Sequence, residues 1–255
     1  MRGLWATLRN AFAEALAKPA ALVSQMVVMA ANDFVWVIFW VLFIDRVGTL
    51  GGWDRDRILL LQAVLTAAGG LSLGVFANAR RVGVMAVDGG LDAVLSLPVP
   101  PLAHLLVRRI EPVNMGDLAF GIVLFAVVGD PTPVRTLVFV LAVLASATLL
   151  TGFLVLTGAL AFFIGRSESG ELGFNAMLLM GAYPVDVFAG AVKVLLFSVV
   201  PAAFVATVPA RLIDDFDLAL AAQLVGVAST FAVAAATTFT LGLRRYTSGS
   251  VWSRV

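Results

Sequence analysis

Cysteine is absent from this chain, and histidine occurs once, at His104. The lack of cysteine excludes disulfide bonds, thiolate metal sites and cysteine nucleophiles, and a lone histidine disfavours a histidine-built metal site. His104 lies beside basic residues without ligand partners, so it is predicted to be solvated at the membrane boundary. No GxxxxGK[ST] loop, strand-linked GxGxxG, HExxH or GxSxG motif occurs, so the chain is not expected to hydrolyse ATP by itself.

Charge is also scarce, because 61% of the 255 residues are hydrophobic and 13% are charged. This is too little polar surface to cover a water-soluble globule, so we predict an all-α integral membrane protein. A bilayer core about 30 Å thick needs roughly 20 apolar residues of helix. Six spans are predicted within one transmembrane domain over 1–255, at 20–44, 58–77, 113–128, 134–164, 172–200 and 218–243.

Two further segments are predicted not to cross the membrane. Residues 1–18 place apolar side chains such as Trp5 and Phe12 at helical spacing opposite Arg9 and Glu14, which predicts an amphipathic helix lying on the interface rather than a cleaved signal. Between Pro201 and Pro209, the run AAFVATVP is too short to cross, so an outer re-entrant hairpin is expected before the last span.

The basic residues are distributed unevenly between the predicted loops. If the N-terminus is cytoplasmic, the outer segments hold Arg46, Arg55, Arg57, Arg135 and Arg211, while the inner segments hold Arg2, Arg9, Lys18, Arg80, Arg81, Arg108, Arg109, Arg166, Arg244, Arg245 and Arg254. The positive-inside rule therefore predicts that both termini are cytoplasmic.

The first span carries a stripe of polar, sulfur and aromatic side chains at spacings of three and four. Its members are Gln25, Met29, Asn32, Asp33, Trp36 and Trp40. A carboxylate near mid-membrane is costly in lipid, so Asp33 is expected to face protein or water. It either lines a cavity that meets a cationic or hydrogen-bonding substrate, or is a buried carboxylate, paired with Lys193 or protonated and bonded to backbone.

The fifth span combines a helix-breaking proline, Pro184, with ionisable groups. The candidate residues here are Asn175, Met180, Tyr183, Asp186 and Lys193. A broken helix with such groups indicates either a transport route or a kink that shapes the outer hairpin. Asp117, near the inner boundary of the third span, is predicted to be an interfacial or paired charge.

An amphipathic stretch at 88–98, DGGLDAVLSLP, lies between the second and third spans on the basic side. On a helix, Leu91, Val94 and Leu95 would share one side, with Asp92 and Ser96 on another. A small, exposed and half-apolar helix of this kind is predicted to be a docking surface.

The order of these features resembles the ABC-2 type permeases, and most closely a branch long catalogued as a family of unknown function. The residues that carry the resemblance are Gly90, Leu91, Asp92, Leu95 and Pro98, followed by Tyr183, Pro184, Phe188, Gly190, Pro201, Phe204 and Pro209. The resemblance extends over essentially the full length of the chain.

The resemblance implies a permease subunit of an ATP-binding cassette exporter. Two permeases, identical or paralogous, would enclose the pathway, and two separate ATPase subunits would bind ATP and Mg, so no cofactor is bound directly. Gly90, Leu91, Asp92, Val94, Leu95 and Leu97 would form the coupling helix, and the polar residues of the first and fifth spans would line the pathway or the dimer contact. Aspartate at Leu91 and Leu95 is expected to uncouple the ATPase without unfolding the permease.

Three other interpretations remain open from the sequence. The first is an ion-coupled secondary transporter with Asp33, Asp186 and Lys193 as a relay; the others are a lipid-modifying enzyme and a structural membrane subunit. The aromatic and methionine-rich stripe with an intramembrane acid favours a hydrophobic, amphipathic or cationic small molecule as the substrate, and the resemblance implies that this substrate moves outward. The expected partners are membrane lipids and protein subunits, not nucleic acid, and the Ala, Val and Gly richness favours the plasma membrane of a bacterium.

Overall fold

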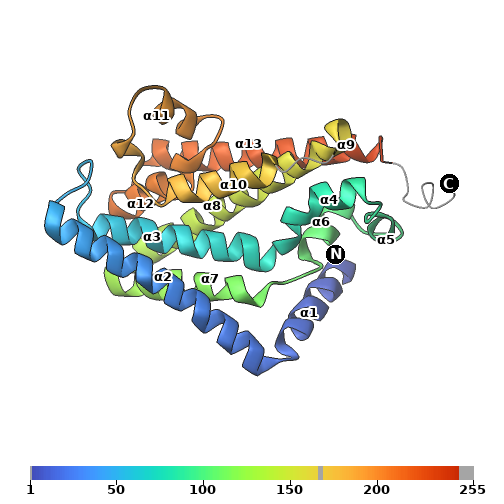
Figure 1. The fold of residues 1–255 in the computed structure, drawn as a ribbon, viewed down its shortest axis with the longest axis horizontal. Coiled ribbons are helices and arrows are strands. Elements are labelled where there is room, and N and C mark those ends of the chain that lie inside the picture. Colours follow the sequence, from blue (N-terminus) through green and yellow to red (C-terminus); the bar gives the residue numbers. More distant parts are fainter. Residues whose placement is uncertain (1, 166–168, 247–255) are drawn as a thin grey trace.

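The computed structural model describes residues 2–165 and 169–246, which form an all-helical bundle (Figure 1). The bundle itself is formed by α2 (Pro19–Val47), α3 (Arg55–Gly70), α7 (Pro112–Val128), α8 (Pro133–Ala159), α10 (Ser169–Gly181) and α13 (Leu218–Leu243). The other elements are α1 (Arg2–Leu16), η1 (Leu71–Val75), η2 (Ala77–Arg81), α4 (Val82–Val87), α5 (Asp92–Leu95), α6 (Pro101–Val107), α9 (Ala161–Ile164), η3 (Val185–Val187), α11 (Gly190–Phe197), η4 (Ala202–Phe204) and α12 (Thr207–Asp214).

Among the described residues, four helical stretches are long and apolar enough to cross a membrane: Pro19–Val47, Arg55–Val75, Pro133–Ile164 and Leu218–Leu243. They correspond to the predicted first, second, fourth and sixth spans. Two bent pairs raise the total to as many as six. One joins α6 to α7 across an 80° bend, and the other joins α11 to Ala202–Asp214 across a 58° bend. The all-helical prediction is therefore confirmed, with four to six candidate spans.

The predicted fifth span, 172–200, does not form one helix. Helix α10 ends at Gly181, and its 13 residues rise only about 20 Å, less than the hydrocarbon thickness. Pro184 breaks the helix rather than kinking it, because proline has no backbone N–H to continue the helical hydrogen bonds. The following residues fold into η3, α11, η4 and α12, which gather at one end of the bundle (Figure 1).

The bundle has two distinct ends (Figure 1). Helices α4, α5 and α6 and the last turn of α13 lie at one end, called the α5 end. The loop after α2 and helices α11 and α12 lie at the other, called the α12 end. The paired arginines Arg80/Arg81, Arg108/Arg109 and Arg244/Arg245 all follow or precede helices of the α5 end, whereas Arg166 and Arg254 of the charge comparison lie outside the described residues.

Polar side chains satisfy the backbone groups left free where the helices break, as a membrane interior requires. The Asn114 amide donates to the carbonyl of Leu73 in the π-helical turn η1, at 3.1 Å. The Gln62 amide donates to the carbonyl of Ala182 just after α10, at 2.9 Å. These two bonds hold the irregular segments of the chain in fixed positions against α3 and α7.

Helices α3 and α7 approach closely because glycines lie between them. A methyl group at Gly70 would collide with the backbone nitrogen of Leu118, and one at Gly121 would lie 2.5 Å from the backbone nitrogen of Ala67. Small residues allow this packing in membranes, where dispersion contacts rather than water exclusion hold helices together.

Adjacent glycines of α3 give opposite predictions. Gly70→Ala should destabilise the fold by about 1–3 kcal/mol, because the backbone of α7 would have to move. Gly69→Ala meets no atom within 4 Å and should stabilise α3 by about 0.5–1 kcal/mol through reduced backbone entropy. Thermal unfolding of the two variants in detergent measures both effects. Equal melting temperatures would contradict the close α3–α7 contact.

Candidate functional site

The segment predicted to dock a partner forms the short helix α5 with flanking turns, but its apolar residues do not share one face. Leu91 and Val94 are fully buried, whereas Leu95 and Leu97 are 40% and 44% exposed. The expectation of one exposed side containing Leu91, Val94 and Leu95 is therefore wrong, because a four-residue helix is oriented by the core beneath it rather than by its own periodicity. Gly90, Asp92, Leu95 and Leu97 remain on the surface.

One contact ties this segment directly to a long helix, and another ties the preceding helix α4 to α8. The hydroxyl of Tyr246, just beyond α13, donates to Asp92 Oδ1 at 2.9 Å. Desolvation, the hydrogen bond to Asp92 and the carboxylate charge together raise the pKa of Tyr246 to about 12, so the phenol stays protonated as the donor. Gly83 of α4 packs against Gly158 of α8, where the backbones approach because neither residue has a side chain. The sequence reasoning missed Tyr246, which is 154 residues from Asp92.

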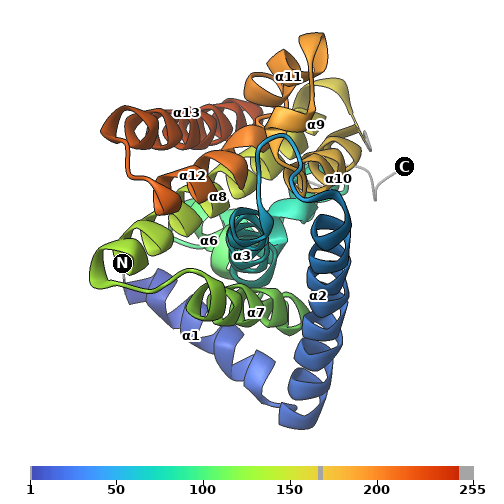
Figure 2. The same cartoon turned by 90° about the vertical axis from the view of Figure 1, so that its left-hand side faces the viewer.

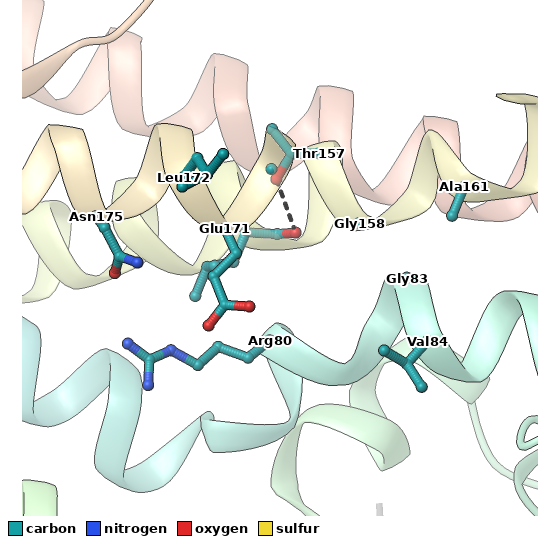
Figure 3. Close-up of a pocket in the computed structure, with 11 residues that line it drawn as sticks. Arg80, Gly83, Val84, Thr157, Gly158, Ala161, Glu171, Leu172 and Asn175 are labelled. Carbon is teal, nitrogen blue, oxygen red and sulfur yellow. Dashed lines mark hydrogen bonds between the residues drawn. The ribbon is translucent and has the colours of Figure 1, made fainter. Parts of the chain in front are cut away.

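A cavity of about 290 Å³ lies beside this contact, between η2–α4, α8 and the start of α10 (Figure 3). The side chains of Arg80 and Glu171 extend into the same space in Figure 3, with Asn175 beside them. The guanidinium of Arg80 lies 5.6 Å from the ring centroid of Phe174. Asn175, predicted from the fifth span, thus belongs to a polar cavity at the α5 end.

The stripe predicted on the first span divides between two faces of α2. Asp33 and Trp40 are buried, at 8% and 1% exposure, and Met29 is half-buried. Gln25, Asn32 and Trp36 are exposed. Amides exposed along a membrane-length helix are unfavourable against lipid. We therefore expect this outer face of α2 to contact protein or water.

Asp33 is paired with another acid rather than with a base. Its carboxyl group interacts with that of Asp117 on α7, and within the described residues no donor reaches Asp33 Oδ2 or Asp117 Oδ1. The pairing with Lys193 considered from the sequence is not formed. Two adjacent buried carboxylates repel each other, so at most one of them is expected to carry a charge.

The face of α2 that points inward also meets the break after α10. The ring of Trp40 packs edge-on against Tyr183, with centroids 5.4 Å apart. Met177 is fully buried and Met180 half-buried on α10. Figure 2, seen from the α12 end, shows α2 and α10 on the same side of α3, with α13 on the other side. The candidate residues of the first and fifth spans therefore occupy one side of the bundle.

At the α12 end, Asp186 is the centre of a polar network. Its carboxylate accepts hydrogen bonds from Trp53 Nε1 at 2.9 Å and Lys193 Nζ at 3.1 Å, and a further one from Arg211. Burial opposes ionisation, but the hydrogen bonds from Trp53, Arg211 and Lys193 outweigh it and hold the pKa of Asp186 below its ordinary value. The network fastens the loop after α2, η3, α11 and α12 together. Of the three residues of the alternative relay, Asp186 and Lys193 pair with each other, whereas Asp33 interacts with Asp117.

The Asp186 network gives a pH-dependent prediction. Asp186→Asn should lower stability by about 1 kcal/mol, since the cationic partners are some two-fifths exposed and partly screened. Because the folded pKa is lowered, this contribution is complete above the ordinary pKa of 3.8 and disappears as pH falls through the folded value.

Melting temperatures of wild type and Asp186→Asn should therefore differ by a constant amount at neutral and weakly acidic pH and converge in stronger acid. Asp45→Asn is the matched control, because its contact with Arg55 is 3.9 Å long and more than half exposed. A difference that persists unchanged in strong acid would contradict the assignment of the stabilising charge to Asp186.

The sequence predicts that His104 is solvated, and this prediction is wrong. It is buried at 6% exposure, and its Nδ1 lies 3.2 Å from Thr7 Oγ1, so the ring joins α6 to α1. Burial, together with the charge of Arg108, lowers its pKa and favours the neutral ring. In the described part of the chain, no three histidine, aspartate or glutamate side chains are grouped as metal ligands.

A family model described as ABC-2 family transporter protein matches residues 28–250 of the sequence. No curated protein matches the chain. No solved structure matches it either. The matched range includes the docking segment and all the predicted spans, but it begins after the first turns of α2.

Proposed function

Because the chain belongs to the ABC-2 transporter family, we propose that it is the permease subunit of an ATP-binding cassette exporter, driven by separate ATPase subunits. In this family the permease is the membrane subunit, and a partner normally carries the ATPase activity. The sequence has no phosphate-binding loop of its own, so ATP and Mg would bind to the partner.

The observation that carries this proposal is the form of the α5 segment. Leu91 and Val94 anchor it in the core, while Leu95 and Leu97 expose apolar surface at the basic end of the bundle. Movement of this segment would reach α8 through the Gly83–Gly158 contact and α13 through Tyr246. We therefore assign the α5 end to the cytoplasm, with both termini on that side, and α5 to the groove of an ATPase.

The second element of the proposal is a pair of permeases that enclose the pathway. Gln25, Asn32 and Trp36 on the open side of α2 would be covered by a second permease, identical or paralogous. Closure of the ATPase subunits would then rock the two bundles against each other and change the side to which the central space opens.

The substrate proposed is a hydrophobic, amphipathic or cationic small molecule that leaves the cell across a bacterial plasma membrane. Support for this class comes from the exposed side of α2, where Trp36 and the amide of Asn32 offer stacking and hydrogen-bonding surface. The outward direction is that of the exporters which the sequence resembles.

Affinity purification from the native membrane tests the proposal. A tagged permease extracted in mild detergent should bring down an ATPase subunit with a phosphate-binding loop, identified by mass spectrometry. An untagged strain serves as the control. Recovery of a permease that transports substrate but has no such partner, even after chemical crosslinking in intact membranes, would overturn the proposal.

A further inference from the structure

We propose that a cavity between α1 and the α4–α6 segment binds the headgroup of an anionic phospholipid. The cavity has a volume of about 660 Å³, which is within the range of small-molecule sites. Its wall includes Ala11 and Glu14 of α1, Arg81 of η2, Met85 of α4, and Arg108 and Arg109 after α6. Gly90 is the one residue that the cavity wall shares with the docking segment, and none of the residues proposed for the pathway line the cavity.

The charge of the cavity favours an anion. Three arginines line it against a single acid, Glu14. Among residues 2–165 and 169–246, neither Arg81 nor Arg108 forms an ion pair, and Arg109 reaches Glu111 only at 3.6 Å with more than half of its side chain exposed. Guanidinium groups bind phosphate oxygens in pairs, so unpaired arginines around one space fit a phosphate.

The position of the cavity favours a lipid over a dissolved phosphate. Helix α1 exposes Trp5, Phe12 and Leu16, at 68%, 38% and 59%, along the apolar side that the sequence predicts to enter the interface. The first turns of α2 continue this surface with Val23 and Val27, which are more than half exposed. Helix α1, which forms one wall of the cavity, thus also carries apolar surface for acyl chains on the side away from Ala11 and Glu14, and the cavity is larger than a phosphate ion requires.

A lipid headgroup bound in the cavity would also stabilise the position of the docking segment. Met85 and Gly90 belong to the cavity wall and flank the turn that leads into α5. A bound headgroup would join this turn to α1, so the response of the permease to its ATPase should depend on anionic lipid. This consequence rests on the proposed function, whereas the binding itself does not.

Binding is tested on the purified permease without any ATPase. Native mass spectrometry in detergent, with added phosphatidylglycerol or phosphatidylcholine, should show retention of phosphatidylglycerol by the wild type. Retention by Arg81→Gln/Arg108→Gln should be about thirtyfold weaker, as the loss of two headgroup contacts implies. Arg80→Gln/Arg244→Gln removes the same charge from the same end, outside the cavity, and should retain lipid like wild type. Melting temperatures of both double variants establish that they are folded.

Three results would overturn the inference. The first is equal retention of the two lipids by the wild type, and the second is an equal loss of phosphatidylglycerol retention in the two double variants. The third is displacement of phosphatidylglycerol by inorganic phosphate, which would indicate a site for a soluble anion. If lipid is retained as expected but ATPase stimulation is indifferent to it, the headgroup site stands and the proposed coupling through α5 fails.

Discussion

Aspartate at both Leu95 and Leu97 is expected to abolish ATPase coupling while the permease remains folded. Both side chains are about two-fifths exposed on the α5 segment, so each would enter an apolar groove of the ATPase. A carboxylate placed there loses its hydration without gaining a partner, and the association should weaken by roughly a hundredfold or more. Copurification of the ATPase and its stimulation in proteoliposomes measure the loss.

Leu91→Asp is the control that separates docking from folding. Leu91 is fully buried, so its replacement by a charge should destabilise the α5 end by more than about 4 kcal/mol and reduce the amount of folded protein. The sequence-based prediction that aspartate at Leu91 leaves the fold intact is therefore wrong, because Leu91 is buried. Normal ATPase stimulation in Leu95→Asp/Leu97→Asp would exclude this surface as the docking site.

A cysteine at Asn32 is expected to form disulfide-linked permease dimers in native membranes. The chain has no cysteine of its own, so a single substitution reports one position. Asn32 lies near the middle of α2 on the exposed face, where an amide would otherwise contact lipid. Two copies related by a two-fold axis along the bundle would bring equivalent residues of this face together. Most of the protein should migrate as a dimer after mild oxidation.

Val233→Cys provides the matched control. Val233 is 65% exposed near the middle of α13, on the opposite side of α3 from α2 and α10 (Figure 2). It should remain monomeric under the same oxidation. Crosslinking through Val233 but not through Asn32 would place the interface on α13 and leave the polar face of α2 to lipid or to a paralogous permease.

The spans that could be predicted are those in which apolar length alone decides the structure. Helices α2, α8 and α13 exceed 25 residues each, and the predicted positions agree with the structure to within three residues when α8 is taken with α9 as the stretch Pro133–Ile164. The length of the apolar run could not predict that the helix ends before Pro184. Whether a proline kinks or ends a helix depends on partners for the freed backbone groups. Those partners include Gln62 and Thr207, which are distant in sequence.

The candidate site was predictable in its residue types but not in its pairings. Asp33 was expected to avoid lipid, and it does, yet its neighbour Asp117 comes from another helix with no local signal in the sequence. The burial of Leu91 and Val94 likewise depends on the core beneath α5, which helical periodicity over four residues cannot reveal. The link from Tyr246 to Asp92 also arises from tertiary packing alone.

Reconstitution in sealed vesicles tests most directly whether the permease is driven by a partner ATPase. Vesicles that contain the permease, the copurified ATPase and ATP should accumulate a fluorescent lipophilic cation against its gradient, and vesicles with the permease alone should only equilibrate it. Dissipation of ion gradients should leave the ATP-driven accumulation unchanged. Uphill accumulation by the permease without the ATPase would contradict the account.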